Sequence, residues 1–284
     1  MSKTQAMLKI PIAPNSIQKG VPLKLLLDKE AITQLAQNIN FVYPAFNSSS
    51  FISETLKGLE DLSLKERSSH IAKSLKDFLP HVYSEAIEIL LKSLTPPLKK
   101  TEGNGLAGLF YMPHCSFIEE FGGDIAYNNN IDPYDVSMSA QYKLTTRFTC
   151  EYSIRPFIVN DERRTLQLLY TWMKDENPHV RRLCSEGTRP RLPWSKKIDS
   201  FISNPEPCIP ILEQLKNDPD LYVRRSVANH LGDIAKDNLE VALSICENWL
   251  TNASPELKWV IRHALRNPVK RNVKRAIELR NSAK

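Results

Sequence analysis

Glycine and aromatic residues are scarce in this chain of 284 residues. It has 9 glycines, and Phe, Trp and Tyr together make up 8% of the residues. Leu, Ala, Lys and Glu are frequent, and these residue types favour helices. No segment of useful length alternates apolar and polar residues in the way a half-buried strand does. The composition therefore argues against a β-rich fold. Its 42% hydrophobic and 25% charged residues are typical of a globular protein with a true core.

Cysteines are few and form no motif. The five cysteines include no CxxC motif and no close pair, which argues against a disulfide framework and fits reduced thiols in a cytosolic protein. They are Cys115, Cys150, Cys184, Cys208 and Cys246. The start of the chain, MSKTQAMLKIPIAPNS, lacks the apolar segment of a secretory signal, and no run of 18 apolar residues occurs. A cytoplasmic location with no membrane partner is expected.

Conventional catalytic and cofactor motifs are also absent. The sequence contains no HExxH, Walker loop, GxSxG or Rossmann fingerprint. The 6 histidines are dispersed. His230 and Asp233 could share a helix face, but a metal needs more ligands than two. A structural role is favoured for His230, and no metal or cofactor is expected.

Positive charge is concentrated in the C-terminal part. The net charge is +6, and the residues from Thr171 onward hold 20 Lys and Arg against 14 Asp and Glu, whereas the preceding part is balanced. From Leu257 to Lys284, nine cations face only Glu278. Such asymmetry indicates a polyanionic partner or a solvated helical face, and the total charge alone does not decide between them.

Helical periodicity and breakers predict an irregular N-terminal arm over residues 1–20 and a single domain over 21–284. Proline and glycine interrupt the arm, and the domain reads as successive helices separated by Pro, Gly and Asn. The expected helical segments are 23–39, 51–59, 64–78, 82–94, 137–152, 163–173, 194–202 and 208–215.

The C-terminal half repeats itself. The segment DENPHVRR from Asp175 recurs as DPDLYVRR from Asp218, with Val180 and Val223 separated by 43 positions, and a weaker copy, SPELKW, begins at Ser254. Two helices per unit and a period near 40 residues are typical of HEAT-like solenoids. The sequence thus predicts an all-α, HEAT-like helical repeat with a concave basic cleft suited to a rod-shaped partner.

Three segments join an acid to basic residues. Glu151 lies four positions before Arg155, as on one helix face. Glu186 lies in the run RRLCSEGTRPRLPW, which starts at Arg181, and Asp233 follows the second Val-Arg-Arg turn. For Asp233 the spacing favours a structural ion pair, as in other charge networks, while for Glu151 and Glu186 it leaves a structural and a functional role open.

The run from Arg181 to Trp194 is the most unusual stretch. One acid stands among four arginines, which repel each other unless an anion lies among them, so a phosphate backbone is indicated. Trp194 closes the run and is interpreted either as a core anchor or as a functional aromatic.

The segments EYSIRPF, HVRRLCSEGTRPRLPW and YVRRSVANHLGDIAK resemble the AlkC-type DNA alkylation-repair glycosylases of bacteria. Residues 63–80 and 109–121 also fit that family, so the resemblance covers about residues 20 to 280. One departure is Gly232, where family members often have Asn. Some members carry a C-terminal immunoglobulin-like domain, which is expected to be absent here because no strand-rich sequence precedes Lys284.

The resemblance implies a DNA glycosylase of base excision repair that releases cationic alkylated bases, chiefly 3-methyladenine and in some members 3-methylcytosine, from duplex DNA without deep base flipping. Carried over by motif, Glu151 and Glu186 match active-site acids, Asp233 an acidic partner and Trp194 an aromatic beside the lesion. The expected partner is alkylated DNA, bound by a monomer with no obligate protein partner. The basic residues expected to bind it are Arg155, Arg189, Arg191, Arg224, Arg225, Lys258, Arg262 and Arg266.

Two alternatives from other classes remain open at this point. A non-catalytic HEAT-repeat protein that binds DNA structures would keep the basic groove, and a protein-binding scaffold would show no salt-dependent affinity for DNA. Which alkylated base is preferred, the role of residues 1–20 and the oligomeric state do not follow from the sequence.

Overall fold

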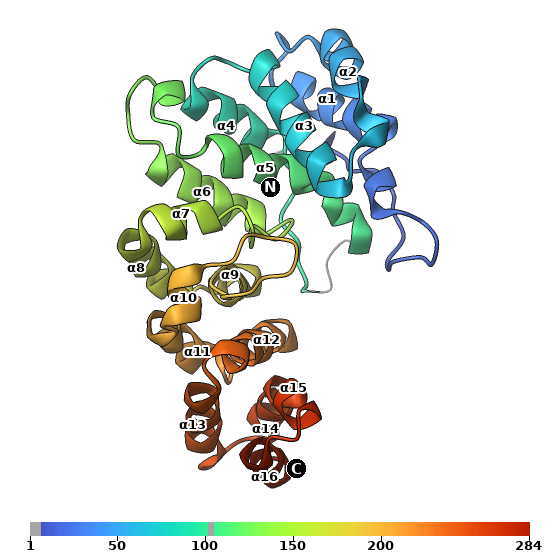
Figure 1. The fold of residues 1–284 in the computed structure, drawn as a ribbon. Coiled ribbons are helices and arrows are strands. Elements are labelled where there is room, and N and C mark those ends of the chain that lie inside the picture. Colours follow the sequence, from blue (N-terminus) through green and yellow to red (C-terminus); the bar gives the residue numbers. More distant parts are fainter. Residues whose placement is uncertain (1–6, 102–104) are drawn as a thin grey trace. The chain divides into compact units, whose positions relative to one another are not determined.

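The structure is a computed structural model that describes residues 7–101 and 105–284. Helices and irregular segments account for these residues, and no strand occurs among them (Figure 1). The all-α prediction is confirmed. The chain divides into two compact units, Met1–Ile154 and Arg155–Lys284. The division into an arm and a single domain stays a prediction, and residues 1–6 of that arm lie outside the described part of the chain.

The first unit is built around helices that bury aromatic and aliphatic side chains. Helix α3 packs against α5, and the ring of Tyr83 stacks on that of Phe117 in the core. Helix α3 begins with a capping box, in which the Ser63 amide donates to the Glu66 carboxylate. The elements are η2 (Leu23–Leu26), α1 (Lys29–Val42), α2 (Ser48–Leu56), η3 (Leu59–Asp61), α3 (Leu64–Phe78), α4 (Tyr83–Lys92), η4 (Gly105–Tyr111), α5 (Met112–Phe121), η5 (Ala126–Asn128) and α6 (Tyr134–Thr145).

The second unit contains the repeated helices. Helix α12 packs against both α9 and α14, and each of these three helices lies in one of the three repeat copies seen in the sequence. Gly232 permits this close approach, since a Cβ there would lie 3.3 Å from the Ala264 carbonyl oxygen. The elements are α7 (Arg155–Asn160), α8 (Glu162–Trp172), α9 (Pro178–Gly187), α10 (Asp199–Ser203), η6 (Glu206–Cys208), α11 (Ile209–Leu215), α12 (Leu221–Asp237), α13 (Leu239–Leu250), α14 (Pro255–Ala264), α15 (Arg266–Lys270) and α16 (Lys274–Ser282).

The first arginine of each Val-Arg-Arg turn has an architectural role. Arg181 donates to the carbonyls of Asp175 and Glu176 in the preceding turn, and Arg224 does the same to the carbonyls of Asp218 and its neighbour Pro219. Arg181 also pairs with the Asp218 carboxylate at 2.6 Å. One repeat is thereby linked to the next, and the repeat inferred from the sequence has a matching set of contacts.

Two helix predictions were wrong in ways that affect the candidate site. The helix expected over 137–152 ends at Thr145, so Glu151 lies in a turn and shares no helix face with Arg155. Arg155 and Pro156 begin α7 instead of ending a helix, because proline is tolerated in the first turn, where amides have no intrahelical acceptor. The helix expected from Trp194 starts only at Asp199, and the preceding residues form a loop.

Among the described residues, no helix combines the length and the apolar character needed to span a bilayer.

Candidate functional site

Glu186 and Asp233, separated by 47 positions in the sequence, come together through one arginine. Arg189 donates from Nη1 to Glu186 Oε1 at 2.5 Å and from Nε to Asp233 Oδ2 at 2.7 Å. All three residues are buried, with at most 8% of their surface exposed. Helix α9 supplies Glu186 near its C-terminus and α12 supplies Asp233, so the packing of these two helices builds the cluster.

Two additional cations lie next to these carboxylates. Arg182 lies 3.6 Å from Glu186, and Lys236 donates to Asp233 Oδ1 at 2.7 Å. Burial disfavours the Glu186 carboxylate, but Arg182 and Arg189 outweigh burial and hold the pKa of Glu186 below its ordinary value. The site therefore keeps a buried, ionised carboxylate among cations.

His230 lies beside this cluster as a buried neutral side chain. Its Nδ1 is 2.9 Å from the Ser185 carbonyl oxygen. Complete burial, together with the positive charge of Arg189, lowers the pKa of His230 to about 3. The geometry fits the structural role that the sequence favoured for this histidine.

Trp194 stands at the tip of a closed loop. The Ile198 amide donates to the Pro190 carbonyl at 3.1 Å, which brings the two ends of the loop together. Trp194 is 86% exposed and has a φ of 67°, in the left-handed region that non-glycine residues rarely adopt. The interpretation of Trp194 as a core anchor is therefore wrong. An exposed ring held in a strained conformation is typical of a binding site.

We expect the change Trp194→Gly to raise the free energy of unfolding by up to about 1 kcal/mol, because glycine adopts positive φ without the penalty of a Cβ. The matched variant Trp194→Ala keeps the penalty and should show no gain. Urea unfolding of both variants measures the difference. Equal stability of the two variants would contradict the claim of strain.

Two arginines that contact the loop already have acceptors. Arg191 forms a bidentate pair with Asp237 at the end of α12, with distances of 2.6 and 2.7 Å. Arg155 is 2% exposed and donates to backbone carbonyls of the same loop, including that of Lys196 at 2.7 Å. Both contacts fix the loop to the helices around it.

Glu151 belongs to the first unit and has its own local support. The Thr149 hydroxyl donates to Glu151 Oε2 at 2.7 Å, in the turn that follows α6. The side chain is half-buried. Its role as an active-site acid stays a prediction.

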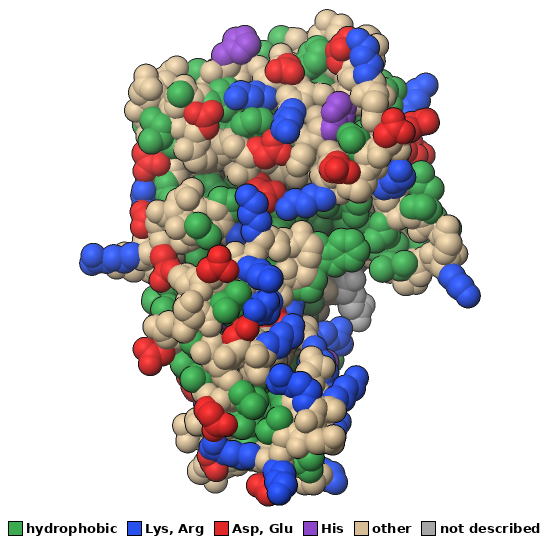
Figure 2. All heavy atoms as spheres, viewed as in Figure 1, with side chains coloured by type: hydrophobic (Ala, Val, Ile, Leu, Met, Phe, Trp, Pro, Cys, Tyr) green, Lys and Arg blue, Asp and Glu red, His purple; other side chains and the backbone are tan. Residues whose placement is uncertain are grey.

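The remaining predicted DNA-binding residues lie on α12, α14 and α15. Arg225 is exposed, whereas the other four are half-buried and donate to backbone carbonyls. These four are Arg224, Lys258, Arg262 and Arg266. Figure 2 shows Lys and Arg side chains gathered over the C-terminal elements on the face in view. Their function as a DNA-binding surface stays a prediction.

A polar cluster that sequence reasoning missed links these helices. Asn229 Oδ1 is 3.1 Å from His263 Nε2 and accepts from Arg266 at 3.0 Å, while the ring of Trp259 stacks on His263. Asn229 occupies the position in its repeat that Glu186 occupies in the preceding one, 43 residues earlier. The repeat spacing was the signal that could have identified it.

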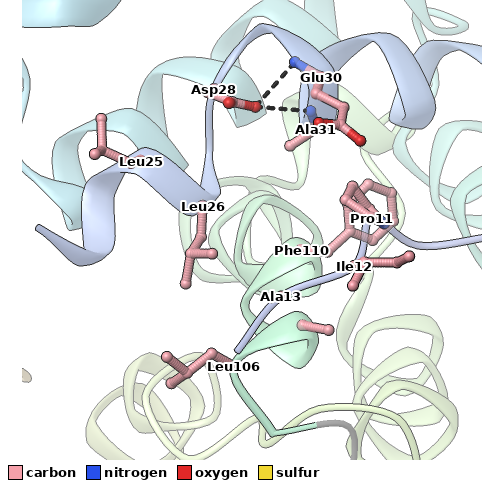
Figure 3. Close-up of a pocket in the computed structure, with 11 residues that line it drawn as sticks. Pro11, Ile12, Ala13, Leu25, Leu26, Asp28, Glu30, Ala31, Leu106 and Phe110 are labelled. Atoms are coloured by element: carbon pink, nitrogen blue, oxygen red, sulfur yellow. Dashed lines mark hydrogen bonds between the residues drawn. The ribbon is translucent and has the colours of Figure 1, made fainter. Parts of the chain in front are cut away.

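A second site would need a cavity or a group of metal ligands outside this cluster. Among residues 7–101 and 105–284, no group of three or more His, Cys, Asp or Glu side chains could hold a metal ion. A cavity of about 60 Å³ in the first unit is lined mainly by apolar side chains, with the Asp28 carboxylate occupied in accepting from the amides of Glu30 and Ala31 (Figure 3). It is far smaller than typical ligand pockets of about 300–1,000 Å³.

Comparisons with known proteins identify the family of this chain. The model of the DNA alkylation repair enzyme family matches residues 145–268, the range that holds Glu151, Glu186, Trp194 and Asp233. The uncharacterised protein YhaZ of Bacillus subtilis (strain 168) is 37% identical over 260 residues, which cover 90% of this chain and 67% of YhaZ. The chain belongs to the DNA alkylation repair enzyme family. The chain is also similar to the alkylpurine DNA glycosylase AlkC of Pseudomonas fluorescens, whose structure was solved bound to DNA containing an abasic site analogue. The TM-score is 0.79 and the identity 36%, over 92% of this chain and 68% of AlkC.

Proposed function

We propose that this protein is a DNA glycosylase of base excision repair that hydrolyses the N-glycosidic bond of cationic alkylated bases in duplex DNA. The expected substrates are 3-methyladenine and, as a second class, 3-methylcytosine. The observation that carries the proposal is a buried, ionised Glu186 next to a loop that exposes a strained Trp194. The similarity to AlkC, solved with an abasic site analogue, supports the same reaction class.

The chemistry needs no proton donor for the leaving base. An N3-alkylated base already carries positive charge, so cleavage of its bond to the sugar leaves a neutral base. The sugar then develops positive charge like that in glycoside hydrolysis. A fixed carboxylate stabilises this cation and can orient or deprotonate the attacking water. One well-placed electrostatic group of this kind contributes roughly 3–4 kcal/mol.

The proposed roles follow the burial of each side chain. Glu186 supplies the negative charge, Glu151 acts as a second acid, and Asp233 holds Arg189 in register with Glu186. The exposed Trp194 ring provides a cation–π contact to the damaged nucleoside, worth on the order of 1–2 kcal/mol. In this proposal the lesion is not flipped into a deep pocket. It stays close to the stacked bases of the DNA and is recognised by its charge.

Phosphate binding is assigned to cations outside the buried cluster. Arg225 is exposed on α12, and Lys258, Arg262 and Arg266 lie on the neighbouring α14 and α15. Contacts to phosphates position a protein on DNA without reading its sequence. Arg189 is instead paired to two carboxylates. A role for it in the charge balance of the cluster is therefore more consistent with the geometry.

The deciding experiment is a base-release assay on methylated duplex DNA, with the released bases separated by chemical identity. We expect 3-methyladenine among the products. Absence of any released base, combined with binding to DNA that weakens steeply with salt, would favour a non-catalytic DNA-binding protein. Absence of both release and salt-dependent binding would favour a protein-binding scaffold.

A further inference from the structure

The guanidinium of Arg155 is buried against the backbone that flanks Trp194. Its Nε donates to the Lys196 carbonyl at 2.7 Å, and its Nη1 donates to the Gly187 and Arg189 carbonyls at 3.0 and 2.8 Å. Its Nη2 donates to the Pro190 carbonyl at 3.4 Å. These acceptors lie on both sides of Trp194 in the sequence. The planar guanidinium of Arg155 therefore joins the segment that enters the loop to the segment that leaves it.

The loop needs such support because regular structure does not supply it. Residues 188–198 form neither helix nor strand. Carbonyls in such a segment need partners when they are buried, and a guanidinium offers five donors in a rigid fork. The left-handed conformation of Trp194 persists only where its surroundings hold it. The pair Arg191–Asp237 and the buried Leu192 fix one side of the loop, while Arg155 fixes both ends.

We propose that Arg155 is a positioning residue that holds the loop from Gly187 to Lys196, and thereby places Trp194 for contact with the damaged nucleoside. It acts on the reaction through the loop and makes no phosphate contact of its own. The kinetic part of this proposal rests on the proposed glycosylase function, whereas the structural part does not.

The chain offers a matched control in the other unit. Arg67 is 4% exposed and likewise donates from Nε, Nη1 and Nη2 to four backbone carbonyls, those of Leu62, Lys24, Leu27 and Glu60. The variants Arg155→Lys and Arg67→Lys both keep the positive charge but lose the planar guanidinium with its five donors. Both should lose stability, but only Arg155→Lys should alter the Trp194 loop.

Fluorine NMR of protein labelled with 5-fluorotryptophan reads the loop directly. The chain has 4 tryptophans, and Trp194→Phe assigns the resonance of Trp194. In Arg155→Lys we expect that resonance to shift and narrow as the loop becomes mobile, with the other three unchanged. In Arg67→Lys it should stay in place. An unchanged Trp194 resonance in a folded Arg155→Lys protein would overturn the proposal.

Single-turnover base release at saturating DNA gives the kinetic test. We expect Arg155→Lys to slow release by at least about tenfold, because small misplacements of a reacting group have large effects, while affinity for undamaged DNA is retained. Loss of DNA affinity with an unchanged rate would instead assign Arg155 to phosphate binding and overturn the proposal.

The two proposals fail separately. If the unmodified protein releases no base, the glycosylase assignment fails, and the NMR result still decides the role of Arg155 in the loop. If Arg155→Lys does not fold, relaxation of the Trp194 resonance in the unmodified protein decides it. A rigid loop predicts relaxation like that of the buried Trp249, and a freely mobile indole would contradict the proposal.

Discussion

Replacing Glu186 by glutamine is expected to reduce base release from methylated DNA by about 10²- to 10³-fold, the effect of removing one fixed electrostatic group from an active site. Glutamine has nearly the same shape and can still accept a hydrogen bond from Arg189, so the packing of α9 against α12 is retained. The negative charge that would stabilise the sugar cation is lost. Single-turnover release at saturating DNA measures the change.

The affinity of the Glu186→Gln protein for methylated DNA should remain near that of the unmodified protein, because a buried carboxylate makes no favourable contact with phosphates. Glu151→Gln is expected to reduce release in the same direction. Full activity of both variants would remove these two acids from the mechanism. A parallel loss of affinity and rate would indicate that the substitution had disturbed the fold.

The pH dependence of the rate gives an independent check on Glu186. Its pKa is lowered by Arg182 and Arg189 despite burial, so the carboxylate stays charged as pH falls through the ordinary value of 4.5. Its contribution to activity and to stability is thus present above that value and is lost only below it. In Arg182→Met the pKa of Glu186 should rise, and the acid limb of the rate profile should move to higher pH. If the acid limb of the rate profile did not move, Arg182 would not be a cause of the lowered pKa of Glu186.

Replacing Arg189 by methionine is expected to lower the free energy of unfolding by about 3–5 kcal/mol, since removing one partner of a buried ion pair leaves its counterpart buried and uncompensated. Here two carboxylates, Glu186 and Asp233, lose their shared cation. Lys236 and Arg182 remain and limit the loss. Urea unfolding followed by tryptophan fluorescence measures the effect.

The matched control is Arg191→Met. Arg191 pairs with Asp237 in similar geometry, but the two side chains are 29% and 22% exposed, compared with 9% for Arg189 and 3% for Asp233. Exposed pairs are screened by water and contribute little. We therefore expect a much smaller loss for Arg191→Met. Equal losses in the two variants would show that burial does not govern the Arg189 cluster.

Local sequence signals predicted the regular elements well where strong breakers flank them. Helix α3 begins and ends at Leu64 and Phe78, as expected from the capping residues before it and Pro80 after it. The errors occurred where Pro156 begins a helix instead of ending one, and where proline and apolar residues near Trp194 imitated helical periodicity. Short-range patterns cannot distinguish these cases, because the group that binds the carbonyls of the loop, the guanidinium of Arg155, lies far away in the sequence.

The sequence by itself determined the all-α class, the 43-residue repeat and the identity of the unusual run from Arg181 to Trp194. These properties depend on periodicity, breakers and charge count, which are local.

Tertiary structure alone decided what each arginine of that run does. Arg181 links two repeats, Arg182 lies beside Glu186, Arg189 joins Glu186 to Asp233, and Arg191 pairs with Asp237. Four guanidiniums that look equivalent in sequence differ in burial and in their acceptors. The packing of α9 on α12 and the return of the loop set those acceptors, and both depend on contacts between residues more than thirty positions apart.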